Sequence, residues 1–175
     1  MAKLKKMLSD IHAPYIVSLM RLIETQSKTT LANWSIDYAE TNILSIYESA
    51  YPADTRLREA LNAARDWLAG KIKLPVVKKL VLDTHAAARE AEAYPAAQAA
   101  ARTIGQAAAT IHTPTHALGL ALYGAMAVAY NRAGIHEKPE VYEQMAAEEC
   151  AKMEAALRAV SVPNEPNPAK INWNC

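Results

Sequence analysis

The most constraining feature of this sequence is an uncharged stretch near its middle. Residues 103–130 contain no Asp, Glu, Lys or Arg. Their continuously apolar part, 117–130, is shorter than the roughly 20 residues that a membrane-spanning helix needs. His112, Pro114 and His116 interrupt the stretch before that part. We therefore expect no membrane span, and we expect a helix that is apolar on all sides to lie at the centre of a bundle.

The composition of the whole chain favours closely packed helices. Alanine fills 36 of the 175 positions, whereas Gly occurs only 5 times and Phe is absent. Alanine has the highest helix propensity of all residues. Two Cys are too few for a disulfide framework. A formal net charge of +1 gives no general attraction to nucleic acid or to an anionic membrane, so neither is an expected partner.

The N-terminal residues do not have the pattern of a secretory signal. Three Lys occur within residues 1–7, but Asp10 and His12 follow where a long apolar segment would be needed. We expect Cys150 and Cys175 to be free thiols in a reducing compartment. Together these features predict a cytoplasmic protein.

Apolar residues recur at three- and four-residue spacing along most of the chain, and no segment predicts a strand. Several of these segments have Pro at their first position, and two of them end at Gly70 and Gly134, so these residues delimit the expected helices. The expected helices cover about residues 13–25, 30–50, 55–69, 75–94, 95–111, 114–134 and 139–159.

Residues 161–175 are expected to form an extended tail because their three Pro oppose a helix. The tail can dock through Ile171 and Trp173. No linker within residues 1–160 is long enough to separate two domains. The expected fold is therefore all-α, a single-domain bundle of about seven helices followed by an extended Pro-rich C-terminal tail.

The histidines are candidate metal ligands. His112 and His116 are four residues apart, a spacing that places two ligands on one helical face. Together with His85 they could bind Zn or another divalent metal. However, Pro114 interrupts the shared face, the sequence contains no HExxH, and histidines in a core or at a cap are more often hydrogen-bonded than metal-bound. We expect no metal or cofactor and keep the three-histidine site as an alternative.

No pattern of residues indicates catalysis. The chain lacks Gly-x-Ser-x-Gly, P-loop and Rossmann glycine motifs. Cys150 and Cys175 have no obvious neighbouring base. Carboxylates occur mainly on faces expected to be solvated, so no general acid–base pair stands out. We therefore expect a protein that is not an enzyme.

Arginine carries the remaining candidate chemistry, because its guanidinium binds carboxylates in a bidentate manner. One interpretation is an internal ion pair, since Arg56 and Arg58 follow Asp54. The other is an interface that receives an acidic loop of a partner, with Trp34 and Trp67 as aromatic anchors. The arginines concerned are Arg56, Arg58, Arg65, Arg89 and Arg102.

Several segments, taken in order, resemble a known family. They are Trp34–Glu40, Tyr51–Ala60, Ala64–Gly70, His85–Arg89, Ala101–Ala107 and Thr110–Gly119. In this order they are similar to the immunity proteins of bacterial polymorphic toxin systems, in particular the immunity-five-like class. The resemblance spans about residues 30–130.

The resemblance implies a small helical protein that binds and blocks a cognate toxin and catalyses nothing. One departure is Gln106, where a His is expected after the Gly, and it removes one possible metal ligand. The matching positions are Trp34, Asp54, Arg56, Arg58, Arg65, Trp67, Gly70, His85, Arg89, Arg102, Gly105, His112, His116 and Gly119.

Three hypotheses follow from the sequence. The first is a toxin-binding immunity protein. The second is a protein that binds a metal or small molecule through its histidines, and the third is a homo-oligomer that buries apolar surface of helix 30–50 or 114–134. The candidates for partner binding or for a polar core are Asp54, Arg56, Arg58, Arg65, His85, Arg89, Arg102, His112 and His116.

Overall fold

The computed structural model describes residues 4–174, which form eight α-helices, one short 3-10 helix and no strand. The prediction of an all-α fold is thus confirmed. The elements are α1 (Pro14–Ile23), α2 (Lys28–Asn42), α3 (Leu44–Ala50), α4 (Arg56–Leu68), α5 (Leu74–Glu90), α6 (Pro95–Ala109), η1 (Pro114–His116), α7 (Ala117–Ala133) and α8 (Pro139–Val160).

The number of helices differs from the prediction because segment 30–50 is not one helix. It is divided into α2 and α3 at Ile43, whose φ of −115° departs from helical geometry. The side-chain amide of Asn42 donates to the carbonyl oxygen of Tyr38 at 3.1 Å. Asn42 thereby competes with the backbone for a helical acceptor, which favours a helix end at this point.

Two other helix boundaries also differ from the prediction, and proline explains both. Residues 91–94 are not helical, because Tyr94 precedes Pro95 and the residue before a proline disfavours helical geometry. Segment 114–134 begins with the separate turn η1 at Pro114 before α7 starts.

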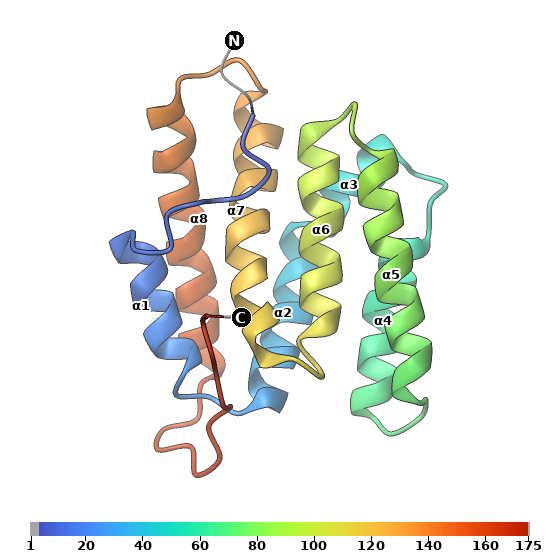
Figure 1. Cartoon of the computed structure of the whole chain (residues 1–175), viewed down its shortest axis with the longest axis vertical. Helices are drawn as coiled ribbons and strands as arrows, with labels where there is room; N and C mark the ends of the chain where they lie inside the picture. The colour runs from blue at the N-terminus through green and yellow to red at the C-terminus, as the bar shows by residue number, and fades with distance from the viewer. Residues whose placement is uncertain (1–3, 175) are drawn as a thin grey trace.

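The helices are arranged around α6 and α7. Figure 1 shows α8, α7, α6 and α5 side by side, with α1 outside α8, with α2 behind α7 and α6, and with α3 behind α6. α6 contacts α2, α3, α4, α5 and α7, and α7 also packs against α8. The expectation of a central helix in segment 114–134 is therefore confirmed for α7. Within residues 4–174 no helix combines the length and the apolar character that a bilayer crossing requires.

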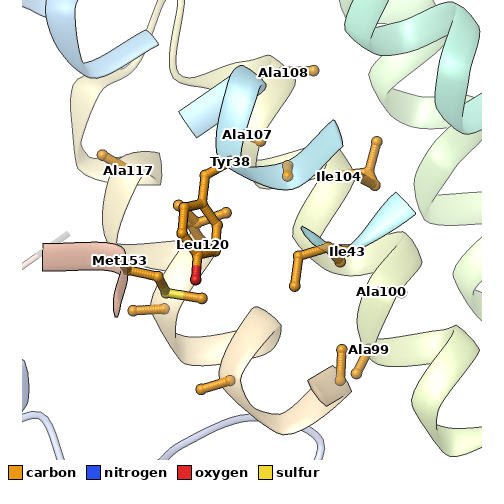
Figure 2. Packing of buried hydrophobic residues seen from close by; sticks show 14 of the residues in the cluster. Tyr38, Ile43, Ala99, Ala100, Ile104, Ala107, Ala108, Ala117, Leu120 and Met153 are labelled. Atoms are coloured by element: carbon orange, nitrogen blue, oxygen red, sulfur yellow. The ribbon is translucent and has the colours of Figure 1, made fainter. Parts of the chain in front are cut away.

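Alanine allows α6 to contact so many neighbours. Ten of its positions are buried: Ala97, Ala99, Ala100, Ala101, Thr103, Ile104, Gly105, Ala107, Ala108 and Ala109. Figure 2 shows larger side chains of the surrounding elements, among them Ile43, Leu120 and Met153, beside these small ones. Close packing of this kind leaves little space for a bulkier residue on α6.

The C-terminal tail is not helical, as predicted, and it is attached to the turn between α1 and α2. The N–H of Val162 donates to the side-chain oxygen of Gln26 at 2.7 Å. The N–H of Ala169 donates to the backbone oxygen of Gln26 at 2.8 Å. The Trp173 indole donates to Glu24 at 2.7 Å. Ile171 and Trp173 are partly buried against the core, so the predicted docking is confirmed.

Candidate functional site

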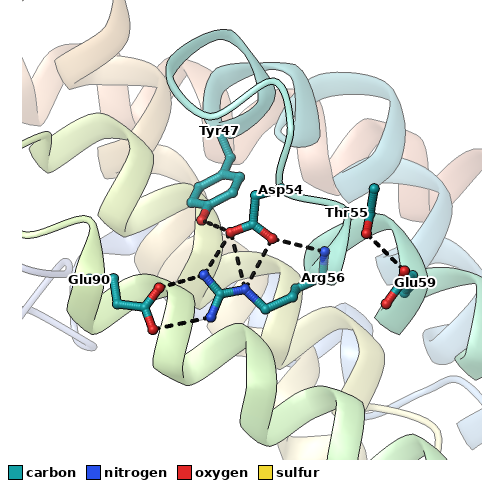
Figure 3. A network of polar contacts seen from close by, with 6 residues as sticks. All are labelled: Tyr47, Asp54, Thr55, Arg56, Glu59 and Glu90. Carbon is teal, nitrogen blue, oxygen red and sulfur yellow. Dashed lines mark hydrogen bonds and ion pairs between the residues drawn. The ribbon is translucent and has the colours of Figure 1, made fainter.

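The nine candidate residues separate into two groups, and the first is an ion-pair network around Arg56. The Arg56 guanidinium lies 2.7 Å from Asp54 and 2.5 Å from Glu90 on α5 (Figure 3). Asp54 also accepts a hydrogen bond from the Tyr47 hydroxyl at 2.6 Å and one from the N–H of Arg56 at 3.0 Å. The network thus joins α3, the start of α4 and α5.

These contacts strongly favour the charged form of Asp54. The hydrogen bonds from the Arg56 side chain are the largest cause, and they lower the Asp54 pKa to about 2. The Tyr47 pKa is raised, first by burial and then by its hydrogen bond to Asp54. Tyr47 therefore remains a neutral donor to an ionised carboxylate.

Arg58 and Arg65 are also held by carboxylates of the same molecule. Arg58 lies 2.9 Å from Glu48 on α3 and 3.8 Å from Glu40 on α2. Arg65 lies 2.7 Å from Glu40 and 2.9 Å from Asp37. These two arginines therefore connect α4 to α2 and α3, and Arg58 does not pair with Asp54.

The remaining five candidates form the second group, which we name the cationic face. His85 and Arg89 are on α5, Arg102 is on α6, His112 follows α6 and His116 ends η1. The rings of His112 and His116 are 6.3 Å apart, centroid to centroid. Arg102, Arg89 and His116 are near enough to His85 to lower its pKa.

Two glycines let helices approach closely beneath this face. A Cβ on Gly105 would lie 2.8 Å from the His85 ring and 2.6 Å from the Thr84 hydroxyl. A Cβ on Gly119 would lie 2.5–2.7 Å from three atoms of the Gln106 side chain. Gln106 in turn shares a hydrogen bond of 2.6 Å with Nδ1 of His116. Only glycine at positions 105 and 119 leaves room for the side chains of Thr84, His85 and Gln106.

The histidines of the cationic face favour their neutral form. The pKa of His85 is lowered by burial first, then by Arg102, Arg89 and His116. The pKa of His112 is lowered by burial and by positive neighbours, and that of His116 by burial alone. No carboxylate contributes to these shifts. The charges that contribute to the shifts of His85 and His112 are therefore all positive.

The proposed alternative of a three-histidine metal site is not supported by the geometry. Among residues 4–174, no group of three or more His, Cys, Asp or Glu side chains is arranged to hold a metal ion. His116 uses Nδ1 for Gln106, and His85 lies beside two arginines that would repel a cation.

Two polar groups of the cationic face lack a partner. Nε of Arg102 and Nδ1 of His112 are buried and make no hydrogen bond within the described part of the chain. Arg89 and Arg102 also have no carboxylate of residues 4–174 within ion-pair distance. Asp83 and Glu90 of α5 are instead bound by Lys79 and Arg56.

The family model described as Imm-5 like putative immunity protein matches residues 21–156. The chain belongs to this family. The match extends beyond the predicted 30–130 and includes all nine candidate residues. Comparisons with curated proteins and with solved structures found no match.

In this Imm-5 like protein, sequence reasoning missed several residues that hold the ion-pair network around Arg56 or the cationic face in place. Tyr47 and Glu90 complete the ion-pair network, yet Glu90 is 34 positions from Arg56 and carries no local signal. In the sequence Gln106 is only a departure from the family pattern, whereas in the structure it forms a hydrogen bond with His116.

Other reactive or aromatic groups of this Imm-5 like chain are buried in its core. Cys150 is fully buried, and burial raises the pKa of its thiol to about 12. Such a thiol is a poor nucleophile. Cys175 lies outside the described residues. Trp34 is almost fully buried and donates to the carbonyl oxygen of Met153 at 3.1 Å, so it is not a surface anchor.

We expect Gly119→Ala to destabilise this Imm-5 like protein by about 1–2 kcal/mol, because the added methyl group overlaps Gln106 and forces α6 and α7 apart. Gly124→Ala on the same helix is the matched control. A Cβ at position 124 would have its nearest contacts at 3.2 Å, and the higher helix propensity of Ala offsets the cost of these contacts. Urea unfolding of both variants measures the difference. Equal stabilities would contradict the prediction.

Proposed function

We propose that this chain is an immunity protein that binds a cognate toxin protein and blocks it without catalysing a reaction. Its membership of the Imm-5 like family is the observation that carries this proposal. The buried Cys150 thiol is in keeping with a role in binding rather than in nucleophilic catalysis.

The cationic face is the surface that we assign to the toxin. Arg89 and Arg102 have no carboxylate partner in residues 4–174, whereas Arg56, Arg58 and Arg65 are already paired within the molecule. Arginine is among the residues that most often dominate the energy of protein–protein binding. We therefore expect acidic residues of the toxin to contact Arg89 and Arg102.

An exposed apolar side chain lies beside these charges. Leu82 is 66% exposed and precedes His85 by three and Arg89 by seven positions on α5, so the three share one side of the helix. Protein interfaces combine a buried apolar contact with surrounding polar groups. Leu82 is suited to supply that contact.

The proposal is tested by co-expressing the chain with the products of toxin-like genes adjacent to its own gene. We expect one of them to be bound and cells to be protected. The double variant Arg89→Glu, Arg102→Glu should lose protection, because each arginine contributes about 2 kcal/mol or more to binding.

Arg132→Glu is the matched control. Arg132 is exposed, lies in the last turn of α7 and forms no ion pair with the described residues, so the same charge change occurs outside the proposed interface. This variant should protect as well as the unmodified chain. Lack of binding to any neighbouring toxin-like product would refute the function. Full protection by the double variant would refute the assigned surface.

A further inference from the structure

Arg102 is an unusual arginine within the cationic face. It is partly buried on the central helix α6, and its Nε has no hydrogen-bond partner among residues 4–174. A buried donor without a partner costs about 1–3 kcal/mol. The protein thus bears this cost without an internal acceptor among residues 4–174 for the Arg102 guanidinium.

The surroundings of Arg102 select an anion. Arg102 acts on His85 together with Arg89 and His116, and none of these groups is an acid. The carboxylates of α5 are bound elsewhere, Asp83 by Lys79 at 2.8 Å and Glu90 by Arg56 at 2.5 Å. Arg89 also acts on Glu90 through its charge, but Glu90 forms its ion pair with Arg56, so Arg89 and Arg102 make no ion pair within residues 4–174.

We infer that Arg102, flanked by Arg89 and His85, forms a receptor for one carboxylate side chain, an Asp or Glu in the toxin. This inference rests on the proposed function, since it names the group of the toxin that enters the cationic face. The two terminal nitrogens of an arginine such as Arg102 present the two parallel donors that a carboxylate accepts in a bidentate manner.

A protein carboxylate fits this site better than the phosphates of a nucleic acid. Binding to nucleic acid draws on many phosphate contacts spread over a basic surface. This chain has a net charge of only +1. On the cationic face only Arg89 and Arg102 are arginines without an ion pair to the described residues. The exposed Leu82 one turn before His85 is an apolar contact that a protein partner covers.

Binding of a carboxylate is coupled to protonation. The histidines are less basic than usual in the free protein, so they are neutral at pH 7. A bound negative charge raises their pKa again, so the complex takes up protons and strengthens as the pH falls from 7.5 to 5.5. The charged groups that act on His85 are Arg102, Arg89 and His116, and those on His112 are Lys78, His116 and Lys28.

Acetate is the probe for the test, with inorganic phosphate and chloride for comparison. The ¹⁵N-labelled protein is titrated with each anion while the Arg102 Nε–H and the His85 ring resonances are followed by NMR. We expect saturable shifts with acetate that are tighter at pH 5.5 than at pH 7.5. Chloride should give no saturable shift.

Two variants of Arg102 separate charge from geometry. Arg102→Lys keeps the charge but lacks the planar pair of donors, so acetate should bind about tenfold more weakly. Arg102→Met should abolish saturable binding, and Arg132→Met should leave it unchanged. Thermal unfolding of each variant verifies that it is folded.

The outcomes distinguish this inference from the function on which it rests. Absence of acetate binding, equal binding by Arg102→Lys, or tighter binding of phosphate than of acetate would overturn the carboxylate receptor. Neutralisation of a toxin by folded Arg102→Met would overturn it as well, while the proposed function would stand. Acetate binding without any neutralised toxin would support the receptor and overturn the proposed function.

Discussion

Replacing Ala100 by Leu is expected to lower the free energy of unfolding by about 3 kcal/mol. Ala100 is fully buried on α6, the helix that contacts five others. Its neighbours in Figure 2 include Ala99, Ile104 and Ile43. Adding methylene and methyl groups to such a packed site forces side chains out of their rotamers and shifts the backbone, which costs about 1–3 kcal/mol and sometimes more. Because five interfaces meet on α6, we expect a cost at the upper end.

The matched control is Ala155→Leu on α8, where the alanine is exposed. Surface substitutions of this kind change stability by about 0.5 kcal/mol or less. Urea unfolding of both variants gives the comparison. If Ala100→Leu were as stable as Ala155→Leu, the close packing described for α6 would be refuted.

The second large effect concerns acid stability. Asp54 has a pKa of about 2 in the folded protein, against an ordinary value of 3.8, chiefly because of its hydrogen bonds with Arg56. A carboxyl group with a lowered pKa stabilises the fold above the pKa of the unfolded chain. That contribution is lost as the pH falls from about 4 to about 2. The shift corresponds to about 2 kcal/mol, and the Asp54 side chain is only 16% exposed.

We therefore expect Asp54→Asn to be about 2 kcal/mol less stable than the unmodified protein at pH 7. The difference should shrink between pH 4 and pH 2, because protonation of Asp54 removes the same charge. Denaturant unfolding at pH 7, 4 and 2 measures this. Asp83→Asn is the control, since it removes an exposed ion pair with Lys79 and should change stability by about 0.5 kcal/mol or less. A constant difference across the pH range would contradict the assignment to Asp54.

The helices were predictable because their signals are local. Apolar spacing of three and four residues, with Pro at first turns and Gly at ends, located every segment that became helical. The division at Ile43 was not predictable in this way. It depends on the Asn42 side chain reaching the Tyr38 carbonyl within a sequence whose apolar residues continue on both sides.

The candidate site was predictable only in part, for the same physical reason. The contact of Asp54 with Arg56 spans two residues and can be proposed from the sequence. The contact of Arg56 with Glu90, and the position of His85 on Gly105, depend on how α5 lies against α4 and α6. Sequence alone therefore named the arginines but could not separate those with internal partners from those without.

The attachment of the tail to the turn after α1 has a consequence for how the chain folds during synthesis. Trp173 binds Glu24 across 149 positions, and α1 packs mainly against α8. Contacts between such distant positions form late, because a long loop must close first. The segments from α2 to α7 can associate while the ribosome is still adding residues. We expect the apolar stripe of α1 to stay uncovered until α8 has emerged, so α1 packs after helices that are synthesised later than it.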